Sequence, residues 1–371
     1  MKKYRLISIN KIDLPLILLT ITSVIFGAVA INSAVKSFDG GFSYVIIQLG
    51  AALVGFLAMY VIASINYRNL SKITKLIYVL SVLMLIAVLI IGTGRESTGS
   101  KSWIRFGPIG IQPSEIVKIA FIITFSNAVS KFGDSLNKPI NIFKSLMHAG
   151  VFIFLIMLQP DFGTTMVFIV IFAGILFAAN ISYKYIIGTG ITVACALPIG
   201  WQFLADYQKN RIRVLFDPES DPLNAGYHVM QSKIAIGSGG VFGKGLGQGT
   251  QTQLDFLPAK HTDFIYSVIG EELGLIGCLI VALLLFTIVI RCIYIAKNAN
   301  TKFGSYICIG VACMFLAHIF ENIGMCLGLM PVTGIPLPFF SYGGSSIVTN
   351  LMAIGLVLGV NSQKNEINFD V

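Results

Sequence analysis

The sequence predicts an all-α, polytopic integral membrane protein with about ten transmembrane helices and one long loop. Three observations carry this prediction. The 371 residues are 55% hydrophobic and only 12% charged. Their mean hydropathy is +0.82, which is far above that of a water-soluble domain. Apolar runs long enough to cross a bilayer, roughly 20 residues each, recur along the chain. Residues 1–371 therefore read as a single transmembrane domain with little room for a soluble one.

Ten apolar runs without turn signals are candidate spans. They cover residues 14–35, 42–65, 75–92, 114–132, 143–158, 163–180, 184–205, 265–296, 304–328 and 343–361. The first run follows a basic stretch, as in a signal peptide, but it is longer than the apolar part of such a peptide and further spans follow it. We expect it to stay uncleaved.

The distribution of Lys and Arg gives the orientation, because cytoplasmic loops are enriched in both. With the N-terminus inside, most cations of the short loops fall on the inner side. Both termini are therefore predicted to be cytoplasmic. The long extracytoplasmic loop, 206–262, then connects helices 7 and 8. The segments 93–113 and 329–342 lie on the same outer face, where we expect the chemistry.

The net charge of +9 does not indicate a nucleic-acid partner, since the cations are scattered over short loops. Anionic membrane lipids or a lipid-linked substrate explain it better. The six cysteines lie within apolar runs and form no close Cys-x-x-Cys pair. They read as core residues rather than as a metal or redox site.

The fourth span opens with Gln112, Pro113, Ser114 and Glu115 and places Lys118 one helical turn later. Residues three apart share a helix face, so Glu115 and Lys118 can pair inside the protein. A capped helix start would explain the glutamate through the helix dipole. It would not explain the lysine.

The long loop begins with a cationic cluster that includes Arg211 and Arg213. Guanidinium groups bind phosphate oxygens bidentately, so a phosphate or pyrophosphate ligand fits, as does a solvated loop near lipid headgroups. Residues 227–236, with Gln231, read as a short amphipathic helix. The glycine-rich stretch 237–249, with Lys244, matches neither phosphate-binding motif. It reads as a flexible substrate-contacting loop or as a plain surface turn.

Asp263 stands at the mouth of the eighth span, two residues after His261. A carboxylate at a membrane boundary is partly desolvated, which raises its pKa and suits it to proton abstraction; simple helix capping is the alternative. Glu271 and Glu272 follow within the span, where at least one must face the interior. The uncharged, proline-rich segment 331–346, with Ser341 and Ser345, survives at membrane depth only if it is buried or lines a cavity.

These residues together resemble the SEDS family (shape, elongation, division and sporulation), and most closely its rod shape-determining members. The short tails and the stretch 334–340 favour elongation over division or sporulation. The matching stretches are spread from the fourth span to the tenth, at 112–118, 159–163, 231–249, 257–274 and 334–346. Ala259 and Tyr266 depart from the usual Glu and Phe. They put only the local loop charge in doubt.

The resemblance implies a peptidoglycan glycosyltransferase in the cytoplasmic membrane of a bacterium. Such an enzyme polymerises lipid II, the undecaprenyl-pyrophosphate-linked disaccharide peptide, beside a class B penicillin-binding protein that acts as transpeptidase. The family's catalytic Asp falls on Asp263, its paired Glu and Lys on Glu115 and Lys118, and its Trp on Trp103.

Our hypothesis is that Asp263 is the general base on the acceptor hydroxyl. Substrate binding is expected from Arg211, Arg213, Lys244, Gln231 and Ser345, and support of the site from Glu115, Lys118, Trp103, His261 and Ser341. A divalent cation, Mg²⁺ or Mn²⁺, is the one cofactor considered; its ligands are unknown, and no organic cofactor is expected. A lipid II flippase and a non-catalytic scaffold that activates a transpeptidase are the alternatives.

Overall fold

The computed structural model describes residues 13–94, 101–106, 109–203, 206–222 and 225–363, and it is almost entirely helical. Within these residues, eight helices are long and apolar enough to cross a membrane. They are α1 (Leu14–Ala34), α2 (Phe42–Ser64), α3 (Tyr67–Ile91), α5 (Pro113–Phe132), α6 (Pro139–Met157), α12 (Ile265–Lys297), α13 (Lys302–Cys326) and α14 (Gly344–Ser362).

Two further helices occupy the remaining predicted spans. The helix α7 (Phe162–Ala178) is apolar but shorter, and α8 (Tyr183–Phe203) covers the seventh span. Each of the ten predicted spans therefore coincides with a helix, and the prediction of an all-α polytopic membrane protein is confirmed. The largest error in a boundary is at α3, which begins eight residues before the predicted 75 because its first turns are polar.

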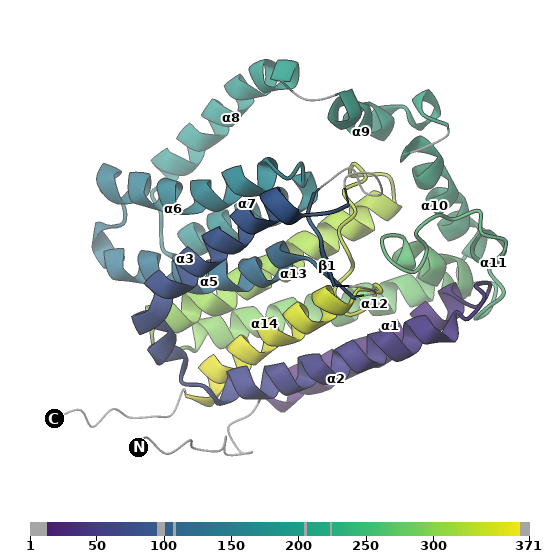
Figure 1. Cartoon of the computed structure of the whole chain (residues 1–371), viewed down its shortest axis with the longest axis horizontal. Coiled ribbons are helices and arrows are strands. Elements are labelled where there is room, and N and C mark those ends of the chain that lie inside the picture. The colour runs from purple at the N-terminus through teal and green to yellow at the C-terminus, as the bar shows by residue number, and fades with distance from the viewer. Residues whose placement is uncertain (1–12, 95–100, 107–108, 204–205, 223–224, 364–371) are drawn as a thin grey trace.

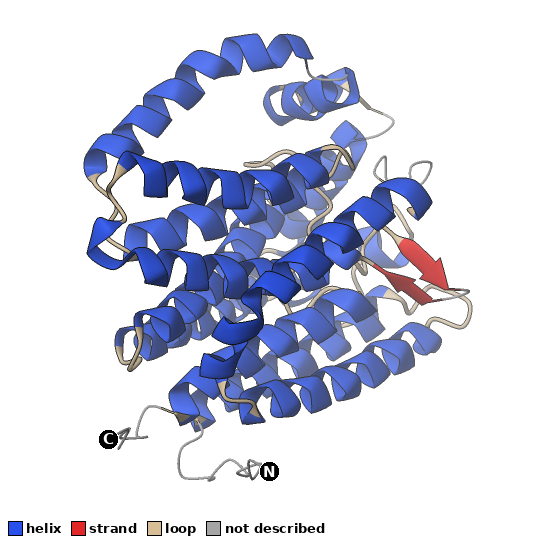
Figure 2. Cartoon of the chain, turned by 60° about the vertical axis from the view of Figure 1, so that its left-hand side comes forward, coloured by secondary structure: helices blue, strands red, loops and turns tan. Residues whose placement is uncertain are grey.

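Connections that were expected on one face lie together at one end of the bundle (Figure 1). They are the antiparallel hairpin of β1 (Ile104–Phe106) and β2 (Ile109–Ile111), α9 (Asp206–Phe216), the 3₁₀ turn Pro218–Ser220, α10 (Ala225–Gly239), α11 (Thr250–Gln253) and the segment 327–343. We call this the outer end. Figure 2 shows the hairpin there, and the start of α1 and the end of α14 at the opposite end. The hairpin was not predicted.

Close helix packing holds the centre of the bundle together. Helices α2 and α14 meet through small residues: a Cβ added to Gly355 would lie 2.7 Å from the carbonyl oxygen of Met59. Small residues allow such close approach between membrane helices. Most residues of α13 and α14 are buried, so these helices form the interior on which the outer segments rest.

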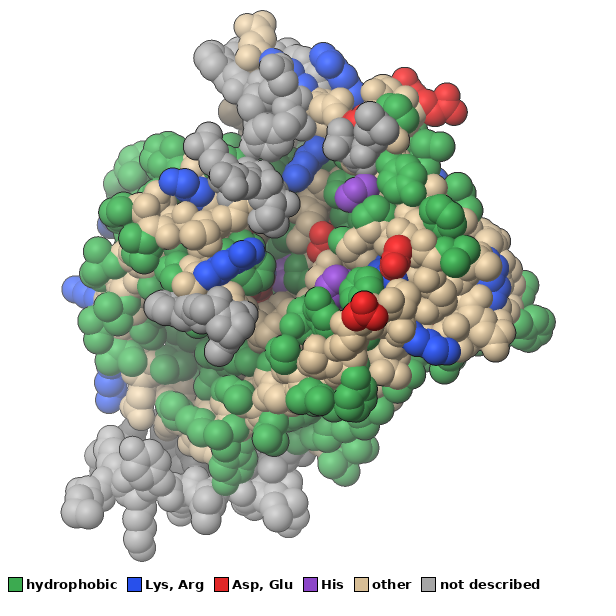
Figure 3. Space-filling model, turned by 45° about the vertical axis from the view of Figure 1, so that its right-hand side comes forward, with side chains coloured by type: hydrophobic (Ala, Val, Ile, Leu, Met, Phe, Trp, Pro, Cys, Tyr) green, Lys and Arg blue, Asp and Glu red, His purple; other side chains and the backbone are tan. Residues whose placement is uncertain are grey.

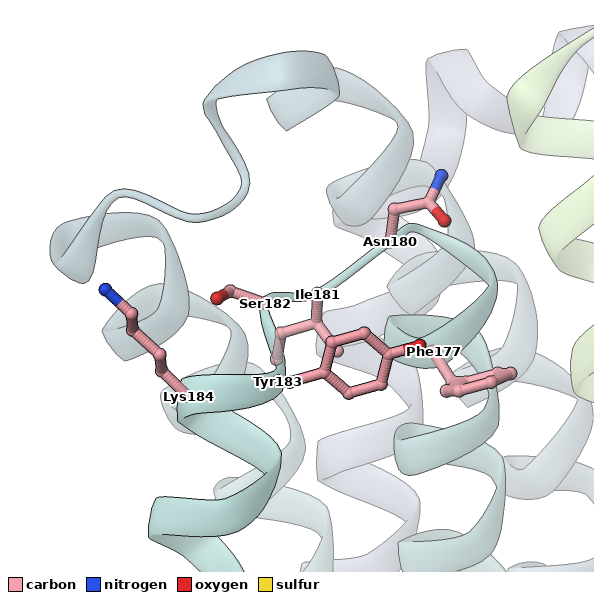
Figure 4. A pocket seen from close by; sticks show the side chains of 6 residues that line it. All are labelled: Phe177, Asn180, Ile181, Ser182, Tyr183 and Lys184. Atoms are coloured by element: carbon pink, nitrogen blue, oxygen red, sulfur yellow. The ribbon is translucent and has the colours of Figure 1, made fainter.

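Helix α8 leaves the bundle. Figures 1 and 2 show it rising away from α7 toward α9, and most of its described side chains are exposed. Its first turn is held by Asn137: Ser182 N donates to Asn137 Oδ1 at 2.6 Å, and Asn137 Nδ2 donates to the carbonyl of Asn180 at 3.2 Å. A cavity of about 490 Å³ lies at this α7–α8 turn and is lined by residues 177 and 180–184 (Figure 4).

Helix α12 is broken at Gly274, which has φ of +66°. The glycine-rich segment enters the break: Leu275 N donates to the Gly240 carbonyl at 2.9 Å and Lys244 N donates to the Glu271 carbonyl at 3.0 Å. Backbone at membrane depth needs such partners. A Cβ on Gly274 would lie 2.4 Å from Gly243 N, so glycine is required at this contact. The segment expected to be a flexible loop is therefore packed against a helix.

Candidate active site

Asp263 lies at the outer end, directly before α12, and its side chain is partly buried. Burial raises the pKa of its carboxyl to about 6, against the opposing attraction of Arg211 and a hydrogen bond with Thr262. A carboxyl with a pKa near 6 is ionised at neutral pH and can still accept a proton in a reaction. The structure thus brings two predicted site residues within electrostatic reach of each other: Asp263, in the turn before α12, and Arg211, on α9.

Backbone contacts fix the turn that carries Asp263. Three consecutive carbonyls of this turn each accept a hydrogen bond. Tyr342 N donates to His261 O at 2.8 Å, Ser341 Oγ donates to Thr262 O at 2.6 Å, and Asn322 Nδ2 donates to Asp263 O at 2.8 Å. Ser341, which was expected to support the site, contacts the backbone of Thr262 directly beside Asp263, and its supporting role stays a prediction. The uncharged segment 331–343 therefore packs against this turn and is hydrogen-bonded to its backbone.

His261 does not face Asp263 as a dyad would. Its ring packs edge-on against Phe38 and Tyr44, with centroid distances of 5.5 and 5.3 Å, and lies 5.6 Å from the ring of Tyr342. Burial lowers the pKa of His261, and the nearby Lys260 lowers it further. A neutral ring packed among aromatic rings fits the supporting role predicted for it.

Glu115 and Lys118 form the predicted pair in α5, with Lys118 Nζ 2.8 Å from Glu115 Oε1. Both are buried, and Lys118 Nζ also lies 2.9 Å from His318 Nε2 of α13. Two further carboxylates, Asp161 and Glu321, interact electrostatically with Lys118. Lys118 is thus the positive charge that interacts with three acidic groups, Glu115, Asp161 and Glu321, in the bundle interior, where an unpaired charge is costly.

Asp161 extends this cluster toward the hairpin. It caps α7 by accepting from Thr164 N at 3.1 Å, and it accepts from Gln112 Nε2 at 3.2 Å. Burial raises its pKa. Asp161 lies in the stretch 159–163, one of those that carry the resemblance, but no role was predicted for it. In the sequence it is a carboxylate at the start of an apolar run, and an ordinary helix N-cap gives the same pattern.

The hairpin residues are joined to α14. The side chain of Ser345 donates to the Gly110 carbonyl at 3.2 Å and accepts from Gln112 N at 3.4 Å. Trp103 pairs with Thr93 in an isolated bridge, and its ring lies 3.1 Å from where a Cβ on Gly110 would be. Ser345 is thus engaged with backbone, and its predicted role in substrate binding stays a prediction.

The remaining substrate-binding candidates differ in their surroundings. Lys244 Nζ forms an ion pair with Glu271 Oε1 at 2.9 Å and donates to Thr250 at 2.8 Å. Glu271 also accepts from Gln251 N and Thr252 N at 2.8 and 3.0 Å, which caps α11. Arg213 on α9 is exposed and Gln231 on α10 is partly buried. Lys244 is therefore already paired with protein groups, whereas Arg213 remains open to a ligand.

The second carboxylate of α12 also holds loops. Glu272 accepts from Ser33 Oγ at the end of α1 and from Gln253 Nε2, the latter at 3.1 Å. Both Glu271 and Glu272 are buried, so the expectation that at least one faces the interior is met by both. Their partners lie in the long connection and at the end of α1, so both carboxylates stabilise the long connection.

A space-filling view from the outer end shows a hollow near its middle, bordered by acidic, basic and histidine side chains (Figure 3). The cavity of Figure 4 is a separate feature, because it lies at the far end of α7 from Asp161, roughly 25 Å away along the helix. Among the described residues, no group of three or more His, Cys, Asp or Glu side chains could hold a metal ion. The divalent cation considered from the sequence stays a prediction without assigned ligands.

Comparison with known proteins decides the family. The model of the FtsW/RodA/SpoVE family, described as cell cycle proteins, matches residues 11–366. The chain belongs to this family. The peptidoglycan glycosyltransferase MrdB of Escherichia coli K12 is 36% identical over 368 residues, which is 97% of this chain and 96% of that protein. A probable peptidoglycan glycosyltransferase FtsW of Geobacter sp. strain M18 is 35% identical, covering 95% of this chain and 97% of that one.

Two solved structures share this fold. A chain from a peptidoglycan synthase complex, described as coordinating polymerization and crosslinking, superposes with a TM-score of 0.83 at 26% identity, covering 96% of this chain and 99% of that chain. The rod shape-determining protein RodA of Thermus thermophilus superposes with a TM-score of 0.73 at 24% identity, over 96% of this chain and 98% of that chain. The resemblance stated from the sequence is confirmed, and the chain is a multi-pass membrane protein.

Proposed function

We propose that this chain is a peptidoglycan glycosyltransferase that polymerises lipid II at the outer face of the cytoplasmic membrane, with Asp263 as general base. The curated relatives at 35–36% identity over nearly the whole chain are named for this activity. The observation that carries the catalytic assignment is the Asp263 carboxyl, partly buried at the outer end, with a raised pKa and a cation, Arg211, within electrostatic reach.

The reaction joins two saccharide units. The 4-hydroxyl oxygen of the acceptor sugar attacks the anomeric carbon of the donor chain and forms the new glycosidic bond. The bond from that carbon to the pyrophosphate oxygen breaks, and its electron pair leaves with the polyprenyl pyrophosphate. Asp263 takes the hydroxyl proton. A carboxyl with a pKa of about 6 is largely ionised at neutral pH, so it is ready to accept this proton.

The cations of α9 act on the leaving group. Negative charge grows on the pyrophosphate as the bond breaks, and a positioned guanidinium stabilises it. Arg211 interacts with Asp263 across the site, and Arg213 on the same helix is exposed. Glu115 and Lys118 lie buried below the hairpin, where they hold the inner wall of the site.

The same proposal places the chain in its membrane. Both termini face the cytoplasm, as the Lys and Arg distribution indicates, and the 206–262 connection faces outward. A class B penicillin-binding protein is the proposed partner, supported by the similarity to a chain of a complex that couples polymerization to crosslinking.

Purified chain incubated with lipid II in detergent tests the activity, with glycan strands resolved on a gel. Polymer formed without a partner and without a membrane to cross excludes both a pure flippase and a non-catalytic scaffold. Asp263→Asn should abolish polymer formation while the variant still folds. Equal turnover by this variant and the wild type would refute the catalytic assignment.

A further inference from the structure

Helix α13 carries one fully buried asparagine, Asn322, whose side-chain amide is used by the site. Its two N–H groups donate to two backbone carbonyls, those of Asp263 and Ile335, each at 2.8 Å. The amide nitrogen of asparagine has two hydrogens, so both are satisfied. The amide therefore brackets two segments that are far apart in the sequence.

The two bracketed segments are both irregular. Residues 261–264 form turns before α12, and residues 331–338 have no regular structure. Within the described residues, no backbone N–H donates to the carbonyls of Asp263 and Ile335, and a buried carbonyl without a partner costs about 1–3 kcal/mol. Four hydrogen bonds reach the turn carbonyls of residues 261–263, and the two from a helix both come from α13: Asn322 Nδ2 at 2.8 Å and the weaker Cys326 Sγ at 3.7 Å, both to the Asp263 carbonyl. It ties the turn to the rigid interior of the bundle.

The position of the second carbonyl matters for the Asp263 side chain. Ile335 follows Gly334, which has φ of +73° and at which an added Cβ would lie 3.6 Å from Asp263 Oδ2. Asn322 thus holds the backbone of Asp263 and the backbone that faces its carboxylate at a fixed separation. The acceptor hydroxyl has to reach the carboxylate in this region.

We propose that Asn322 is a positioning residue for Asp263 and that it sets the orientation and solvent access of the catalytic carboxylate through two backbone carbonyls. The inference rests on the proposed function and adds to it a residue from a helix that does not itself carry the base. Other side chains at this position fail in distinct ways. Neither alanine nor aspartate has side-chain N–H groups to donate, but aspartate also brings a negative charge close to Asp263.

The two substitutions predict opposite changes. In Asn322→Ala the turn loosens and water reaches the carboxylate, so the pKa of Asp263 falls toward its ordinary value. Asn322→Asp loses the same two donors, but its negative charge close to Asp263 opposes ionisation of that carboxyl, and we expect this repulsion to outweigh the loosening and to raise the pKa. The acidic limb of the profile of kcat against pH should therefore move to lower pH in the first variant and to higher pH in the second. In both, kcat at pH 7.5 should fall about 100-fold, as expected for a catalytic group displaced by about 1 Å, with KM changed less than about threefold.

Asn127 provides a matched control. It is a buried asparagine of α5 whose Nδ2 donates to Thr74 Oγ1 at 2.8 Å and to the Ser71 carbonyl at 3.5 Å, within the helical bundle and away from the outer segments. Asn127→Ala should lower the melting temperature and leave both the kcat and the acidic limb at wild-type values. This separates a positioning role from general loss of stability.

The experiment uses the full chain in detergent with lipid II as substrate, and adds a measurement that needs no turnover. Dicyclohexylcarbodiimide modifies protonated carboxyl groups, so its reaction with Asp263 is followed against pH by mass spectrometry of the peptide. The labelling midpoint should shift down in Asn322→Ala and up in Asn322→Asp. Wild-type midpoints and kcat in both variants would overturn the inference. Shifted midpoints in a chain that makes no polymer would support the positioning and refute the proposed function instead.

Discussion

Replacing Asp263 by asparagine is predicted to raise the stability of the protein while it removes the activity. The ordinary pKa of 3.8 for this carboxyl rises to about 6 in the folded chain because the group is desolvated. The folded state therefore binds the proton more tightly than the unfolded state does. Above about pH 6 the ionised carboxylate opposes folding, and asparagine, which carries no charge, removes this cost.

The size of the effect follows from the two pKa values. They differ by about 2, and each unit corresponds to about 1.4 kcal/mol, which gives an upper limit of about 3 kcal/mol. Because the side chain keeps some contact with solvent, we expect roughly 1–3 kcal/mol at neutral pH. The gain shrinks as the pH falls from about 6 to about 4, since the wild-type carboxyl becomes protonated in the folded state and loses its cost.

Thermal unfolding in detergent, followed by tryptophan fluorescence or circular dichroism, measures this effect at pH 7.5 and at pH 4.5. Asp263→Asn should melt several degrees above the wild type at pH 7.5 and near it at pH 4.5. In parallel, kcat for glycan synthesis should fall at least about 100-fold, which is the lower range for a lost general base.

Asp255 serves as the control of opposite sign. It is exposed, and an ion pair with Lys260 lowers its pKa. Its contribution favours folding above its unfolded pKa and is lost as the pH falls, so Asp255→Asn should lower the melting temperature at pH 7.5. A stability gain for Asp263→Asn that does not depend on pH, or no gain at all, would refute the assignment of a desolvated carboxylate at this position.

Three further predictions rest on single contacts. Arg211→Gln removes an attraction that lowers the pKa of Asp263. The acidic limb of the profile of activity against pH should therefore move to higher pH, and the KM for lipid II should rise. An unchanged profile would argue against the interaction between Arg211 and Asp263. Lys118→Met leaves Glu115 and its acidic neighbours without their cation, which should cost about 3–5 kcal/mol and lower the melting temperature. Glu321→Gln instead removes a buried carboxylate of the same cluster, so it should not destabilise the chain. Gly274→Ala places a Cβ 2.4 Å from Gly243 N at a φ of +66°, so the glycine-rich segment should separate from α12. Limited proteolysis should then cleave this segment faster than in the control Gly270→Ala, where the added Cβ would contact mainly side chains.

The spans could be predicted from the sequence because the bilayer imposes one physical requirement on all of them. Each needs an apolar helix of about 20 residues, and this pattern is local. The hairpin at 104–111 escaped because its two strands are short and carry no such signal. The break of α12 at Gly274 was not predicted because it depends on the glycine-rich segment 237–249, which lies earlier in the chain and supplies the missing backbone hydrogen-bond partners.

Within the site, residue types were predictable and partners were not. A carboxylate at the mouth of a span suggested a desolvated base, and Asp263 has the raised pKa that this requires. A lysine in a glycine-rich stretch suggested a ligand contact, but Lys244 is paired with Glu271, which the sequence places in a different element. In the sequence, Asn322 is only a polar residue within the apolar run 304–328, and its two acceptors are main-chain atoms that leave no pattern there.

The proposed base, Asp263, and the cation, Arg211, are held by different parts of the molecule, and the two parts differ in how firmly they are fixed to the bundle. The turn of Asp263 is bonded to α13 and to the 331–343 segment. Arg211 stands on α9, which follows the exposed helix α8 that leaves the bundle. Proton abstraction needs a carboxylate fixed to within a fraction of an ångström, whereas a pyrophosphate can be met by an arginine at the end of a long, flexible side chain. The hydrogen bonds to the carbonyls of residues 261–263 therefore restrain the proposed base, for which a displacement would cost the most.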